Sequence, residues 1–146
     1  MIGYGTNVDD LYVNLHLNTH LELPTQRDTV LHFFEQMKKA YPDLVNFFPR
    51  ESGDLVLEGD KESGHYRWVA IEPRRLCSGH VNPRSFHEVT NLHEMVLEFA
   101  PPLLTISPLD CDSLDLMYGF DFTYEGNHDE IVAEAFGAGP ALESML

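Results

Sequence analysis

A short basic stretch is the first part of the sequence that could do chemistry. Residues 74–85 read RRLCSGHVNPRS and hold three of the nine basic side chains of the chain. The stretch leads into a predicted helix, and the free N–H groups and dipole of a helix N-terminus favour an anion. The residues expected to bind a small carboxylate or phosphate are Arg74, Arg75, His80, Arg84 and Ser85. Internal ion pairing of these arginines with the carboxylates that follow is the simpler alternative.

Histidines and cysteines are the next candidates, because both can bind metal ions. The chain has eight His and two Cys, and Cys77 with His80 could supply two zinc ligands. No second local pair completes such a site. His16 and His20 lie four residues apart on a predicted strand, roughly 13 Å at strand rise, which is too far to share one ion. We therefore predict no metal and no cofactor, and interpret both cysteines as reduced.

Sequence motifs for catalysis are missing. The chain has no G-x-S-x-G elbow, no phosphate-binding GxxxxGK[ST] loop, no GxGxxG and no HExxH. A non-catalytic function is therefore favoured, and the only catalytic candidate is His16, as an acid or base.

Charge is distributed unevenly along the chain. Nine Lys and Arg oppose 24 Asp and Glu, a formal net charge of −15, and every basic residue lies between Arg27 and Arg84. Such a chain repels polyanions, so nucleic acid and anionic membranes are poor partners. The acidic excess suits a basic partner, a cation or a solvated face. With no long apolar run and no signal peptide, we expect a cytoplasmic protein.

Hydrophobic periodicity predicts the elements that must position these residues. Residues 11–23 and 114–124 alternate as half-buried strands, and 54–58 with 65–72 indicate a hairpin. Helices are predicted after Thr25, ending before Pro42, and after Ser85, ending at Pro101-Pro102. Residues 74–84 are interpreted as a mostly polar connector in which 76–81 could form a further strand. Asn127 begins a final helix through Phe136, followed by a tail at 137–146.

Over residues 10–125 this order of elements resembles the ferredoxin-like βαββαβ plait. The resemblance implies an α+β domain with a four-stranded antiparallel sheet and both helices on one face, here with a C-terminal helix added. We predict one domain over 1–146, with a core at about 10–136.

The sheet face away from the helices is expected to be polar and aromatic. The side chains predicted to lie there include Tyr12, Asn14, His16, Tyr66 and Trp68. Such a face suits association with a second copy, so a binding or assembly module that homodimerises through it is the favoured hypothesis. One alternative is a dimeric α+β barrel enzyme with a cavity near His16, and another is an anion-binding domain that uses residues 74–85.

Overall fold

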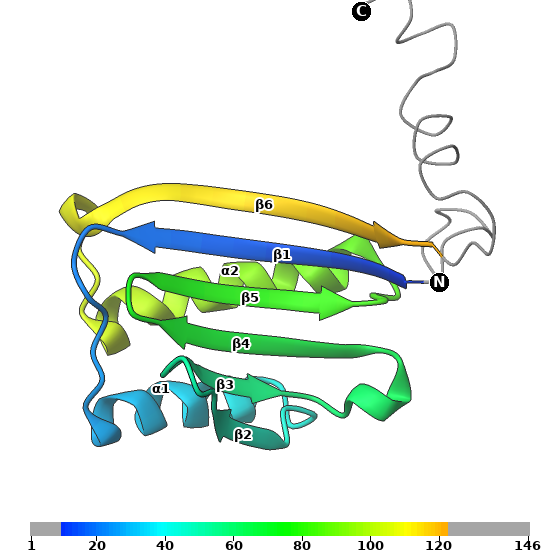
Figure 1. The fold of residues 1–146 in the computed structure, drawn as a ribbon, viewed down its shortest axis with the longest axis horizontal. Coiled ribbons are helices and arrows are strands. Elements are labelled where there is room, and N and C mark those ends of the chain that lie inside the picture. Colours follow the sequence, from blue (N-terminus) through cyan, green and yellow to red (C-terminus); the bar gives the residue numbers. More distant parts are fainter. Residues whose placement is uncertain (1–9, 123–146) are drawn as a thin grey trace, which may run out of the picture.

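Residues 10–122, the part of the chain that the computed structural model describes, form one antiparallel sheet with two helices (Figure 1). The strands are β1 (Asp10–Thr19), β2 (Asn46–Pro49), β3 (Leu55–Glu58), β4 (Tyr66–Glu72), β5 (Arg75–Val81) and β6 (Cys111–Asp121). The helices are α1 (Arg27–Ala40) and α2 (Phe86–Leu104), and short 3-10 turns span Lys61–Ser63 and Pro108–Asp110. The strands lie in the order β2-β3-β4-β5-β1-β6, and both helices lie on one side of the sheet.

The predicted four-stranded plait is wrong, because the sheet has six strands. The segment interpreted as a mostly polar connector forms β5, as the alternative of a strand over 76–81 allowed, and β5 lies between β1 and β4 and is antiparallel to both. Its polar side chains Ser78 and His80 are completely buried on the helix side, so composition concealed a central strand. The short β2 was also missed. The α+β class is confirmed, and the predicted helix at 127–136 lies outside the described residues.

Alternation in β1 builds one side of the core, as predicted. Leu11, Val13, Leu15 and Leu17 are buried under the helices, while the residues between them are only half-buried. α1 contributes Val30, Phe33, Phe34 and Met37 to the core, and α2 contributes Val89, Leu92, Val96, Ala100 and Leu104. The apolar faces of the sheet and of the two helices therefore pack together and form the main core between them.

The start of α2 agrees with the sequence, and its end does not. Ser85 is the N-cap, as predicted, and its side chain accepts from the Glu88 N–H. The helix passes through Pro101 and Pro102 and ends at Leu104 because Ala100 and Leu104 are buried and hold the last turn on the core. α1 begins one residue later than expected, after Gln26, which makes no side-chain cap.

Neither helix within residues 10–122 combines the length and apolarity needed to cross a membrane.

Candidate functional site

The predicted aromatic face lies opposite the helices, with its rings laid flat on the sheet. A Cβ added at Gly79 would collide with the Trp68 indole, and one at Gly119 would collide with the Tyr12 ring. Each ring therefore occupies the space above a glycine of a neighbouring strand. A hollow of about 430 Å³ opens beyond the end of β1, beside Asn18, and its lining includes none of the five residues predicted for the face.

The predicted anion-binding residues lie in two places. Arg74 and Arg75 are at the turn between β4 and β5, whereas Arg84 and Ser85 follow the far end of β5. A strand of this length spans roughly 20 Å, so the two groups cannot clamp one small anion. Arg75 bonds to the Asn18 side chain at 3.0 Å and lies 3.8 Å from Glu72, which is internal pairing. Anion binding at either end stays a prediction.

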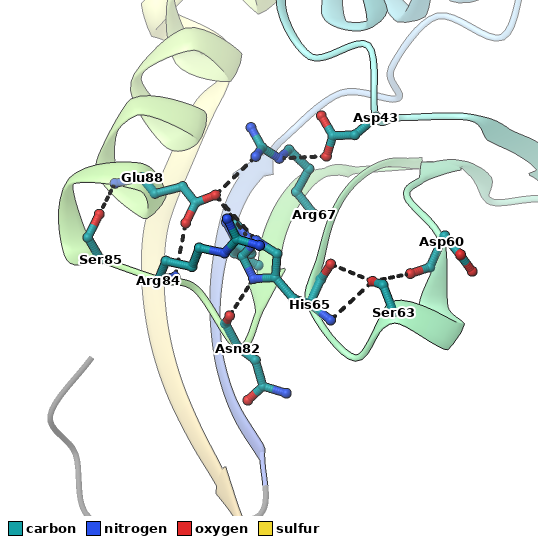
Figure 2. Close-up of polar contacts among 10 residues, drawn as sticks. Asp43, Asp60, Ser63, His65, Arg67, Asn82, Arg84, Ser85 and Glu88 are labelled. Atoms are coloured by element: carbon teal, nitrogen blue, oxygen red, sulfur yellow. Dashed lines mark hydrogen bonds and ion pairs between the residues drawn. The ribbon is translucent and has the colours of Figure 1, made fainter. Parts of the chain in front are cut away.

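The structure brings His80, Arg84 and Ser85 together around Glu88, at the N-terminus of α2 (Figure 2). The Glu88 N–H donates to Ser85 Oγ at 3.1 Å. One Glu88 carboxylate oxygen, Oε2, accepts from the Arg84 N–H at 2.9 Å. These two bonds fix the carboxylate on the first turn of the helix and turn its other oxygen toward the sheet.

That second oxygen, Glu88 Oε1, faces three nitrogen-bearing side chains, which come from the residue just before β4, from β4 and from β5. It lies 3.1 Å from Arg67 Nη2, 3.5 Å from His65 Nε2 and 3.7 Å from His80 Nε2. Arg67 also pairs with Asp43, at 3.1 Å from its Nε, and its guanidinium lies over the Tyr41 ring. One carboxylate oxygen is therefore the meeting point of α2, β4 and β5.

The two histidines have different surroundings. His65 Nδ1 bonds to the backbone carbonyl of Asn82, and since a carbonyl only accepts, Nδ1 carries the proton. In neutral His65 the lone pair therefore lies on Nε2, the atom facing Glu88. His80 is 0% exposed, and neither of its ring nitrogens has a hydrogen-bond partner.

Electrostatics keep His80 neutral and Glu88 ionised near pH 7. Burial is the main cause that lowers the pKa of His80, to about 4, and the charge of Arg67 adds to it. Burial acts to raise the pKa of Glu88, but the Arg84 N–H and the nearby His80, His65 and Arg67 together lower it. Neutral imidazoles beside an ionised carboxylate are a typical set of metal ligands.

Three of the residues around Glu88, namely His80, Arg84 and Ser85, were predicted from the sequence as site residues, whereas His65, Arg67 and Glu88 itself were not. His65 and Glu88 are 23 positions apart, and only the register that places Arg67 opposite His80 brings their elements together. The capping box Ser85–Glu88 could have indicated Glu88, because it places this side chain at the start of the helix.

A second candidate surface is the β6 strip, which we define as Leu114, Leu116, Tyr118 and Phe120. Each of these side chains is about half exposed, between 46% and 53%. They lie opposite residues of β1 that are buried under the helices, so they point to the helix side of the sheet. The Phe86 ring meets the Tyr118 ring edge-on, with centroids 6.4 Å apart.

The outer edge of β6 also lacks a partner strand within residues 10–122, since β6 pairs there with β1 alone. The charged side chains of the strand are all acidic, namely Asp112, Asp115 and Asp121. Long apolar edge strands are templates for pairing with another chain.

No family model matches the chain, and a search of curated proteins finds no match either. A function is therefore inferred from the chemistry of the residues around Glu88 and of the β6 edge.

Proposed function

We propose that the chain is a non-catalytic binding module that docks a basic strand of a partner protein on the outer edge of β6. The observation that carries this proposal is an 11-residue edge strand whose large apolar side chains are half exposed. Monomeric proteins normally protect such edges with charges, bulges or a covering element. Addition of a partner strand would satisfy the free backbone groups and cover the apolar side chains together.

The charge of the chain favours a basic partner over a second copy. From Ser85 to Phe122 the sequence holds seven carboxylates and no Lys or Arg. Two copies, each with a net charge of −15, would repel one another as they approach. Lys or Arg side chains on a partner strand would instead pair with Asp112, Asp115 and Asp121 along the edge.

The proposed surface differs from that of the predicted homodimer. Trp68 and Tyr12 lie flat on glycines and are already partly buried, so they have less apolar area to offer than the β6 strip. The homodimer through the aromatic face stays a prediction; a parent dimer that persists after Leu116→Asp is the result expected for it by light scattering.

The test uses a labelled peptide of alternating valine and lysine, with a valine and glutamate peptide as its charge-reversed control. We expect the lysine peptide alone to bind the full chain, with an affinity that falls as salt is added. Leu116→Asp should weaken binding by at least about tenfold, equivalent to about 1.4 kcal/mol. The matched control is Leu109→Asp, since Leu109 is 92% exposed and lies outside β6; it should bind like the parent.

Light scattering on the same samples distinguishes the other occupants. A parent dimer that Leu116→Asp converts to a monomer would assign the edge to a second copy and overturn the basic partner. A monomer that binds neither peptide would also overturn the proposal.

A further inference from the structure

We propose that His65, His80 and Glu88 bind one divalent metal ion of the zinc class. The donors would be Nε2 of both histidines and Oε1 of Glu88, which lie within 4.8 Å of one another. This site is separate from the β6 strip and does not depend on the proposed binding function.

The geometry of the three atoms suits such an ion. Zinc binds imidazole nitrogen and carboxylate oxygen at about 2.0–2.2 Å, so tetrahedral ligands stand roughly 3.4 Å apart. Glu88 Oε1 is 3.5 Å from His65 Nε2 and 3.7 Å from His80 Nε2. Small side-chain rotations would bring both nitrogens and the oxygen to bonding distance of a common centre.

The environment of His80 is the second, independent observation. A buried imidazole with no hydrogen-bond partner is costly, because both of its polar atoms have lost water. His80 Nε2 nevertheless points at Glu88 from a position with no solvent exposure. A metal ion between His80 Nε2 and the Glu88 carboxylate would give this nitrogen a partner and would also neutralise the charge of the carboxylate.

His65 is held as a metal ligand is normally held. Metal-binding histidines usually donate their other ring N–H to a carbonyl or carboxylate, which orients the lone pair. The bond from His65 Nδ1 to the Asn82 carbonyl does this, and Figure 2 shows the ring between Asn82 and Glu88. The side chains of His65 and Glu88 are about a quarter exposed, at 26% and 22%, so an ion can reach them from solvent.

Arg67 is the main charge that opposes a cation here, since it lies 3.1 Å from the same Glu88 oxygen. Asp43 pairs with the other side of this guanidinium and offsets its charge. The formal charges of Glu88, Asp43 and Arg67 sum to one negative charge, which leaves the site able to accept a divalent ion.

The test is a titration of the metal-free full chain with Zn²⁺ against a chromogenic chelator, with Co²⁺ added in parallel for its visible spectrum. We expect one ion per chain, tetrahedral Co²⁺ bands, and a higher melting temperature with Zn²⁺. His65→Ala and Glu88→Gln should each weaken binding by more than about tenfold and abolish the thermal shift.

The matched controls are His87→Ala and Glu94→Gln, which replace exposed side chains of α2, the helix that carries Glu88. Both should bind Zn²⁺ like the parent. The proposal is overturned if the parent binds no stoichiometric ion, or if His87→Ala weakens binding as much as His65→Ala. Should Glu88→Gln fail to fold, imidazole NMR signals of the parent decide: selective Zn²⁺ shifts at His65 and His80 support the site, and unchanged signals reject it.

Discussion

At the scale of single residues, the pair formed by Ser78 and His93 is the clearest case of a buried polar contact under the helices. Ser78 Oγ lies 2.7 Å from His93 Nδ1, and both residues are buried between β5 and α2. Burial lowers the pKa of His93 from 6.5 to about 4. The native state therefore holds His93 neutral across a pH range in which the unfolded chain binds a proton.

This difference predicts that the free energy of unfolding falls as the pH is lowered from about 6.5 to about 4. The sign follows from linkage, because the unfolded state binds more protons than the native state within that window. Denaturant unfolding with EDTA present should give a smaller pH slope for His93→Gln than for the parent, by up to about 1.4 kcal/mol per pH unit. His87→Gln, at an exposed position of the same helix, should keep the parent slope. Equal slopes for the parent and His93→Gln would contradict the assignment.

At the scale of elements, the residue that follows the last turn of α2 has a strained backbone conformation. Thr105 has φ 57° and ψ 47°, the left-handed conformation, and its N–H bonds to the Pro101 carbonyl. A β-branched residue is unfavourable there, whereas glycine adopts this conformation freely. The helix passes through two prolines and then stops at a position that suits glycine better than the residue present.

We expect Thr105→Gly to stabilise the chain by about 1 kcal/mol, because it removes the left-handed penalty from an exposed side chain. Thr90→Gly, in the interior of the same helix, should destabilise it by roughly 1 kcal/mol or more, since it also loses the bond from Thr90 Oγ1 to the Phe86 carbonyl. Urea unfolding of both variants measures the two signs. A loss of stability on Thr105→Gly would contradict this account of the helix end.

Some of the elements could be predicted from the sequence and others could not. β1, the hairpin of β3 and β4, and the start of α2 carry local signals, namely alternation, a charged turn and a capping box. β5 carries only a weak signal, because Ser78 and His80 are polar yet buried against α2, and the sequence therefore predicts residues 76–81 only as a possible strand. The candidate metal site depends on the pairing of β4 with β5, which no local sequence pattern shows.

At the scale of the whole molecule, net charge opposes the compact state. The nine basic residues all precede Ser85, so the acidic second half has few partners along the chain. Described pairs such as Arg67 with Glu88 and Asp43 neutralise only a small part of this excess. Self-repulsion should therefore lower stability most at low ionic strength.

We predict that the melting temperature rises as NaCl increases from about 0.01 M to 0.15 M, over which the Debye length falls from about 30 Å to 8 Å. Glu98→Lys, at an exposed position of α2, changes the net charge from −15 to −13 and should flatten this dependence. Scanning calorimetry of both chains measures the effect. A melting temperature that falls with NaCl would mean that specific ion pairs outweigh the overall repulsion.

The pairing of β1 with β6 also determines when the sheet within residues 10–122 can be completed. Asn18 on β1 bonds to Asp115 on β6, 97 positions later, while β3, β4 and β5 follow one another through short turns. On a ribosome, the three consecutive strands can pair early, because closing a short loop costs little entropy. β1 keeps one open edge until β6 has been synthesised, and chaperones or neighbouring nascent chains can reach that edge in the meantime. Completion of the described sheet thus has to wait for the synthesis of β6.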